Sequence, residues 1–192
     1  MPSGDVTSPV KSPPTIFTVG HSTRSVAELV ALLRQVAVDV LVDVRSVPRS
    51  RTNPQFNTDT LPAALAAAGI GYRHLPALGG LRGPPKNRVP SLNTLWRNDA
   101  FRNYADYAAT EAFRAGFDQL AALACEEQCA IMCAEAVWWR CHRRIIADYL
   151  LVRGIPVVHI MGSNKIDRAT ITPGARPLAD GTLLYPAAAP AP

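Results

Sequence analysis

The chain has 192 residues, of which 48% are hydrophobic and 18% charged, and its formal net charge is +5. This length favours one domain, and the apolar content excludes a chain that is disordered throughout. The mild positive charge favours anionic partners, either phosphorylated metabolites or nucleic acid, without choosing between them.

The start of the chain and its cysteines bear on where the protein works. Residues 1–14 carry Ser and Pro where a signal peptide needs an apolar run, and no later run approaches the length of a membrane span. The four cysteines lie in one short stretch, Cys125 to Cys141, so we expect reduced thiols and no disulfide framework. We therefore expect a cytoplasmic protein without membrane contact, with flexible tails at 1–14 and 187–192 around a domain at 15–186.

Strand and helix patterns alternate along the chain. A β-rich run that ends at Gly20 is followed by a capping box, Ser25 with Glu28, which opens an amphipathic helix. Residues 38–45 are almost continuously apolar and branched, as in parallel strands buried on both faces. The later elements are expected as a helix at 60–68, a strand at 71–75, helices within 99–127, a strand at 129–135, a helix at 141–153 and a strand at 155–160.

This order of elements predicts an α/β fold. We expect one domain with a mostly parallel sheet of about five strands and helices on both faces, a Rossmann-like three-layer sandwich. Ligands of such folds bind beyond the carboxyl ends of the strands. The polar residues at these ends are Gly20, His21, Ser22, Asp43, Arg45, Arg49, Ser50, Gly79, Gly80, Cys133 and Glu135, and Cys141, His142 and Arg143 open the helix that follows.

The segment CAEAVWWRCHRR, Cys133 to Arg144, is the strongest candidate for a site. A helix N-terminus near Cys141 can bind an anion or lower the pKa of a thiol, with help from neighbouring arginines. Cys133 could instead be a small buried hydrophobe. The arrangement is similar to cysteine phosphatases and rhodaneses, but the spacing from Cys133 to Arg140 is one residue too long for a phosphatase loop, and Glu135 would repel a phosphate.

Metal binding is a weaker interpretation of the same segment. Cys133, Glu135, Cys141 and His142 are all ligand types. Two of them are adjacent, however, and no paired CxxC motifs occur, so we expect no metal site. A further histidine, His159, lies in an apolar strand, and we expect it to be a core residue with satisfied hydrogen bonds.

Carboxylates and arginines offer acid–base chemistry and anion binding. Asp43 and Arg45 either form an ion pair that ends the sheet, or Asp43 acts as a general base and divides proton transfer with Glu135. Because the guanidinium fork suits phosphate and carboxylate groups, we expect Arg45, Arg49 and Arg143 to bind an anion.

Five segments together resemble the family called domain of unknown function 488: TVGHS, DVRSVPRSR, LGG, CAEAVWWRCHRR and IPVVHI. The resemblance covers residues 16–185, and CAE followed by CHR is its most specific element. It implies a compact α/β bacterial protein, enzymatic, with no settled substrate. Trp138 departs from related sequences, which have Pro there. The family pattern marks Gly20, Asp43, Arg45, Pro48, Ser50, Gly79, Gly80, Cys133, Glu135, Cys141, His142 and Arg143.

We therefore expect an enzyme, a hydrolase or transferase, that acts on a phosphate-bearing small molecule such as a nucleotide. The alternatives are a nucleic-acid-binding accessory protein, which would use basic loops around Arg49 and Arg82, and a metal-binding module. The sequence indicates no particular cofactor and no oligomeric state. The expected catalytic residues are Asp43, Glu135, Cys133, Cys141 and His142, and the expected substrate-binding residues are Gly20, His21, Ser22, Arg45, Arg49, Ser50, Gly79, Gly80 and Arg143.

Overall fold

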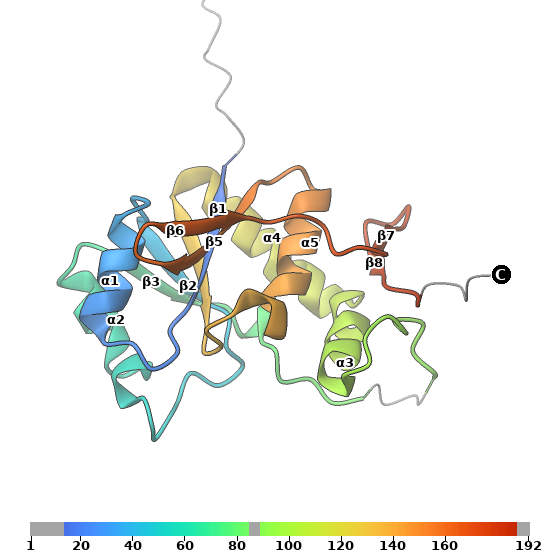
Figure 1. Ribbon diagram of the computed structural model, residues 1–192, viewed down its shortest axis with the longest axis horizontal. Coiled ribbons are helices and arrows are strands. Elements are labelled where there is room, and N and C mark those ends of the chain that lie inside the picture. Colours follow the sequence, from blue (N-terminus) through green and yellow to red (C-terminus); the bar gives the residue numbers. More distant parts are fainter. Residues whose placement is uncertain (1–13, 85–88, 188–192) are drawn as a thin grey trace, which may run out of the picture.

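A computed structural model describes residues 14–84 and 89–187, and its centre is a six-stranded sheet in the order β3-β2-β4-β1-β5-β6 (Figure 1). The neighbouring strands from β3 to β5 pair in parallel, and β6 pairs antiparallel with β5. This confirms the mostly parallel sheet. Apart from residues 14 and 187, the expected tails lie outside the described residues. The strands are β1 (Ile16–Gly20), β2 (Val40–Asp43), β3 (Gly71–His74), β4 (Cys129–Cys133), β5 (Val157–Gly162) and β6 (Lys165–Arg168).

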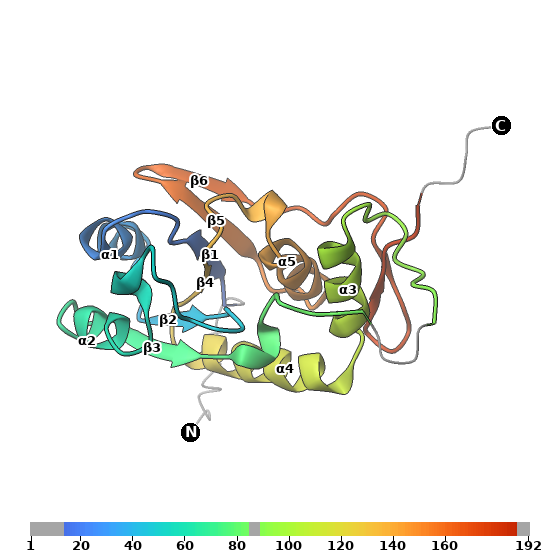
Figure 2. The same cartoon turned by 90° about the horizontal axis from the view of Figure 1, so that it is seen from below.

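Helices cover both faces of the sheet, as Figures 1 and 2 show. On one face lie α1 (Val26–Arg34) and α2 (Leu61–Ala66). On the other lie α3 (Asp99–Ala108), α4 (Glu111–Glu126) and α5 (Arg143–Val152). The predicted Rossmann-like three-layer arrangement is confirmed.

The apolar pattern of the strands fills both layers of the core. All residues of β2 and β4 are buried. Along β2, Val40 and Val42 pack in the layer of α3 to α5, whereas Leu41 packs against α1 and α2, because successive side chains of a strand point to opposite faces. The capping box of α1 also forms as predicted: Ser25 Oγ accepts the Glu28 N–H, and the Glu28 carboxylate accepts the Ser25 N–H at 2.7 Å.

Short elements complete the chain, and they refine the predicted boundaries near the candidate site. The predicted strand 129–135 ends at Cys133, and the predicted helix 141–153 begins only at Arg143 because a 3-10 turn comes before it. Residues 134–142 therefore form a loop. The short elements are the 3-10 turns η1 (Pro54–Phe56), η2 (Pro76–Leu78) and η3 (Trp138–Arg140), and the strands β7 (Arg176–Pro177) and β8 (Leu183–Leu184), which pair beside α3 (Figure 2).

The strand order determines which loops meet. β4 lies between β1 and β2, with Cys133 in register with Gly20 and Met132 in register with Asp43. The chain after β4 therefore leaves the sheet between the segments that follow β1 and β2. The loop stays paired with the first of these, since Ser22 N donates to Ala134 O at 3.0 Å. Among the described helices, none is long and apolar enough to cross a membrane.

Candidate active site

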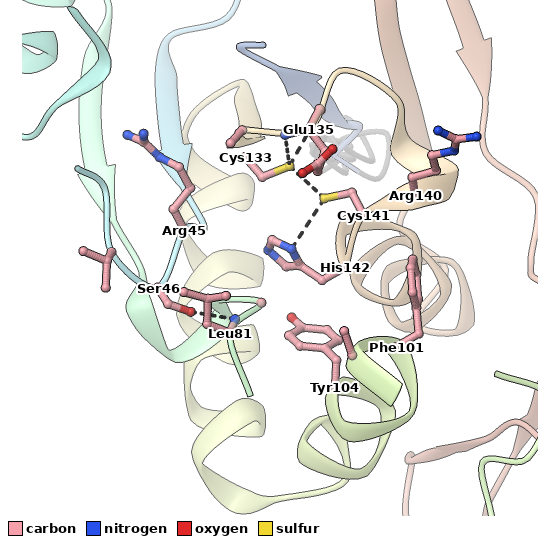
Figure 3. A pocket seen from close by; sticks show the side chains of 14 residues that line it. Arg45, Ser46, Leu81, Phe101, Tyr104, Cys133, Glu135, Arg140, Cys141 and His142 are labelled. Atoms are coloured by element: carbon pink, nitrogen blue, oxygen red, sulfur yellow. Dashed lines mark hydrogen bonds between the residues drawn. The ribbon is translucent and has the colours of Figure 1, made fainter. Parts of the chain in front are cut away.

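A cavity of about 290 Å³ lies beyond the carboxyl ends of β2 and β4 (Figure 3). Four segments line it: residues 45–47 after β2, residues 80–81 after η2, the start of α3, and the loop between β4 and α5. The loop brings Cys133, Cys141 and His142 to the cavity, together with the exposed side chains of Glu135 and Arg140.

Cys133, the last residue of β4, and Cys141, in the loop that follows, are buried and in contact, and we call them the thiol pair. Cys133 Sγ and Cys141 Sγ lie 2.7 Å apart, and their residues are 2% and 3% exposed. Cys133 Sγ accepts the backbone N–H of Glu135 at 3.3 Å. Cys141 Sγ lies 3.5 Å from the backbone N of Arg143, the first residue of α5, where the helix dipole favours a negative charge.

Arg143 is a buried cation that has no carboxylate partner among the residues that the structure describes. Its residue is 1% exposed, and Nε lies 3.1 Å from Cys133 Sγ and 3.4 Å from Cys141 Sγ. The remaining guanidinium nitrogens donate to Glu135 O and Thr18 Oγ1. None of the ion pairs among residues 14–84 and 89–187 includes Arg143. Because a buried charge is costly without an opposite charge, the thiol pair is the group that can neutralise Arg143.

The pKa values of the thiol pair move in opposite directions. Burial raises the pKa of Cys133, and the hydrogen bond and charge of Cys141 raise it further. Burial alone would raise the pKa of Cys141 as well, but the hydrogen bond with Cys133 and the neighbouring His142 and Arg143 outweigh it and hold this pKa well below its ordinary value. The pair therefore shares one proton, with the negative charge on Cys141.

His142 is oriented toward Cys141. Its Nε2 lies 2.9 Å from Val44 O, and its Nδ1 lies 3.4 Å from Cys141 Sγ (Figure 3). A carbonyl can only accept, so Nε2 carries a proton, and Nδ1 lies where it can take the proton of Cys141 Sγ and then donate a hydrogen bond to the thiolate. Gly80 makes room for this ring, because a Cβ at Gly80 would lie 2.4 Å from Nδ1.

Two other glycines that we expected to bind substrate allow neighbouring segments to approach closely. A Cβ at Gly20 would lie 1.8 Å from Glu135 O, so Gly20 lets the loop after β4 pass over the end of β1. A Cβ at Gly79 would lie 2.6 Å from Ser46 Cα, so Gly79 lets two wall segments of the cavity meet. Neither glycine lines the cavity.

Asp43 and Arg45 form the ion pair that was one of the two interpretations of their sequence. Asp43 is fully buried and accepts hydrogen bonds from Arg45 Nε at 2.9 Å and from the Tyr72 hydroxyl at 2.8 Å. Another nitrogen of Arg45 lies 3.3 Å from His21 Nε2, and burial lowers the pKa of His21. Arg45 lines the cavity but Asp43 and His21 do not, so these two support the cavity wall from behind.

Three more predicted residues lie outside the cavity lining. Arg49 is exposed, with its guanidinium 4.0 Å from the Asp59 carboxylate. The backbone N of Ser50 donates to Asn57 Oδ1, and the backbone N of Ser22 donates to Ala134 O in the loop after β4. The structure does not bring these side chains to the thiol pair.

The sequence did not indicate several side chains that line the cavity. The apolar spacing of α3 predicts a helix but does not show where that helix lies relative to the sheet, so its cavity-lining residues could not be identified from the sequence. The cavity-lining residues that the sequence did not indicate are Ser46, Val47, Leu81, Ala100, Phe101 and Tyr104.

His159 supports the site from inside the sheet, and the expectation of a fully satisfied core residue was wrong in part. His159 is buried, its Nδ1 lies 2.8 Å from Thr18 Oγ1, and its ring stacks on Trp138 at 4.3 Å. Within the described part of the chain, however, Nε2 has no hydrogen-bond partner. Burial and the charge of Arg143 lower the pKa of His159 to about 4, so the ring is neutral near pH 7.

One donor set could hold a metal ion. The ligand atoms of Cys133, Cys141 and His142 lie within 4.8 Å of one another. Two thiolates and an imidazole are ligands that zinc accepts. The charge of Arg143 lies beside both sulfur atoms and would repel a divalent cation, so the set fits a metal only in part.

Comparison with known proteins gives one match. The model of the family described as Domain of unknown function DUF488 matches residues 25–150, well over half of the chain. The matched range includes the thiol pair, His142 and Arg143. No curated protein and no solved structure matches the chain.

Proposed function

Because the chain belongs to the family described as Domain of unknown function DUF488, a description that names no reaction, we propose a function from the chemistry of the site. The protein is a hydrolase or transferase in which Cys141 is the nucleophile. The observation that carries this proposal is Arg143, a buried guanidinium that has two sulfur atoms as neighbours and, within the described part of the chain, no ion pair with a carboxylate.

The surroundings of Cys141 favour the reactive form of its thiol. The thiolate, not the thiol, is the nucleophile of cysteine enzymes, and arginine, histidine and helix N-termini stabilise it. All three lie at Cys141: Arg143 Nε at 3.4 Å, His142 Nδ1 at 3.4 Å and the start of α5. The Cys133 thiol donates a further hydrogen bond to the Cys141 thiolate.

These groups define a two-step reaction. The Cys141 thiolate attacks the electrophilic atom of a substrate in the cavity, a covalent bond to sulfur forms, and the leaving group departs with the electron pair of the broken bond. His142 Nδ1 is placed to take the proton of Cys141 before the attack and to return one to the leaving group. Water or a second substrate then releases the product and frees Cys141. This chemistry requires reduced cysteines, which fits the cytoplasmic location expected from the sequence.

The expected phosphate-bearing substrate has less support than the nucleophile. Arg45 is paired with Asp43, Arg143 is occupied by the thiol pair, and Arg49 is outside the cavity lining. Arg140 is the exposed cation that lines the cavity, so an anionic group of the substrate would bind there. We therefore limit the proposal to the reaction class.

A zinc module is the second candidate, supported by the three donor atoms within 4.8 Å. It predicts stoichiometric zinc after purification and thiols that react only after a chelator is added. The nucleic-acid-binding alternative gains little, because Arg82 is folded onto the carbonyls of its own loop.

Thiol alkylation tests the proposed function. The protein is treated with iodoacetamide at pH 6, where an ordinary thiol is almost fully protonated, and the modified cysteines are located by mass spectrometry. We expect Cys141 to react at least about tenfold faster than the exposed Cys125, because the alkylation rate follows the thiolate fraction. The variant Cys141→Ser should lose the fast phase, and the variant Cys129→Ser should keep it. A fast phase on Cys125 with Cys141 unmodified would refute the proposal.

A further inference from the structure

Apolar side chains, two of them strongly exposed, line part of the cavity. Leu81 is 76% exposed and Val47 is 61% exposed, and both line the cavity. Phe101 and Ala100, from the start of α3, also line it. Single exposed apolar residues are ordinary on protein surfaces, but a group of them around one cavity marks a contact surface for an apolar ligand.

The backbone that carries Leu81 is held in place before any ligand binds. The Leu81 N–H donates to Ser46 Oγ at 2.9 Å, which ties the two wall segments together (Figure 3). The next residue, Arg82, folds back and donates to Gly79 O at 2.9 Å and to Pro76 O at 2.8 Å. Its guanidinium lies 3.7 Å from the centre of the Tyr107 ring. The loop thus directs its charge away from the cavity and leaves Leu81 at the rim, so contact with a ligand requires little reorganisation.

The charges around the thiol pair favour a neutral reacting group. The thiolate and the exposed Glu135 carboxylate are negative, and Arg143 is already occupied by sulfur and by Glu135 O. An anionic electrophile would meet two negative charges, with Arg140 as its exposed counter-charge. A cavity of about 290 Å³ is also near the lower limit of ligand pockets, so the substrate is small.

We propose that the substrate is a small neutral ester or thioester with an apolar arm, which lies against Leu81, Val47 and Phe101 while its carbonyl faces Cys141. This inference rests on the proposed function. The Cys141 thiolate bonds to the carbonyl carbon, the bond to the alcohol or thiol breaks, and the leaving group takes the proton that His142 Nδ1 holds. Water then adds to the acyl carbon as His142 takes one of its protons, the C–S bond breaks, and a carboxylic acid and the Cys141 thiolate are released.

The experiment compares alkylating probes that differ in the arm they carry. Rates of Cys141 modification are measured for N-methyl-, N-ethyl-, N-propyl- and N-butylmaleimide, and each is divided by the rate of the same probe with glutathione. We expect the normalised rate to rise about two- to fourfold for each added methylene, the gain expected from partly to fully burying that group. Hydrolysis of p-nitrophenyl acetate and butyrate gives the same comparison for an ester.

Two variants of matched exposure show where the arm binds. Leu81→Ser should reduce the butyl-to-methyl ratio at least about threefold, and Leu92→Ser should leave it unchanged, since Leu92 is 70% exposed and does not line the cavity. Iodoacetate and iodoacetamide, normalised in the same way, test charge, and we expect the neutral probe to react faster.

The outcomes separate this inference from the proposed function. Slow modification of Cys141 by every probe would overturn the proposed function and the inference together. Fast modification by N-methylmaleimide without a rise along the series, or with an equal rise in Leu81→Ser, would overturn only the inference. Faster normalised reaction with iodoacetate would overturn it in favour of an anionic substrate.

Discussion

Removal of both sulfurs of the thiol pair should change how stability depends on pH. The variant Cys133→Ser/Cys141→Ser takes away the negative charge that faces Arg143 and keeps the size of both side chains nearly constant. At a pH where the pair is ionised in the wild type, the variant leaves Arg143 buried without a counter-charge, a change that costs about 3–5 kcal/mol in other proteins.

The directions of the two pKa shifts determine whether stability rises or falls with pH. The lowered pKa of Cys141 means that the folded protein releases a proton which the unfolded chain keeps up to its ordinary value of 9.0. Well below pH 9, the wild type therefore gains about 1.4 kcal/mol of stability per pH unit from this one proton, and the gain falls to zero near pH 9 as the unfolded thiols ionise. Above pH 9 the raised pKa of Cys133 reverses the trend, because the unfolded chain then loses a second proton that the folded protein keeps.

Urea unfolding at pH 7.5, 8.0 and 8.5 measures this slope. The free energy of unfolding of the wild type minus that of the double variant should grow by about 1 kcal/mol across this range, which is a measurable fraction of a typical domain stability of 5–15 kcal/mol. Cys129→Ser is the control, because burial raises the pKa of Cys129 to about 12 and its thiol stays protonated over this range. A difference that stays constant with pH would show that the thiol pair is not ionised, and the reasoning from Arg143 would fail.

Three further predictions concern residues around the thiol pair. Gly80→Ala should slow alkylation of the nucleophile about tenfold or more, because the added Cβ would lie 2.4 Å from His142 Nδ1. A Cβ at Gly83 would have no atom of residues 14–84 and 89–187 within 4 Å, so Gly83→Ala should alkylate at the wild-type rate. The neutral, buried His159 should make the wild type lose about 3 kcal/mol of stability as pH falls from 6.5 to about 4, since the unfolded chain takes up a proton that the folded ring does not, and urea unfolding of His159→Asn should show a smaller loss. One equivalent of hydrogen peroxide should convert the thiol pair to a disulfide with release of two waters, so a thiol titration should fall by two and alkylation at pH 6 should stop; a single peptide carrying sulfenic acid without the crosslink would contradict the pairing.

Local pattern predicted the elements of this fold better than their arrangement. The branched apolar run at residues 38–45 identified β2 as a buried strand, and Ser25 with Glu28 identified the start of α1. These signals are local, since they depend on burial and on hydrogen bonds between near neighbours. The strand order, with β4 between β1 and β2, depends on long-range packing and was not predicted.

The candidate site was predicted in part for the same reason. The loop from β4 to α5 carries the thiol pair, His142 and Arg143 within one short segment, so the sequence alone indicated it. The sequence left open whether Arg45 pairs with Asp43 or binds a ligand. The position of its guanidinium depends on the tertiary structure, which pairs it with Asp43 at the edge of the cavity. The sequence did not predict that Leu81 lines the cavity, because nothing in the local sequence distinguishes this exposed leucine from other loop residues.

The position of Arg143 also limits how this chain can change in evolution. A substitution that removes the sulfurs leaves a buried positive charge, and one that removes the arginine leaves a buried negative charge, so either step alone is costly. Homologous sequences should therefore keep or lose the arginine and the two cysteines together. A homologue in which all three are replaced by apolar residues would keep the fold while having lost the chemistry.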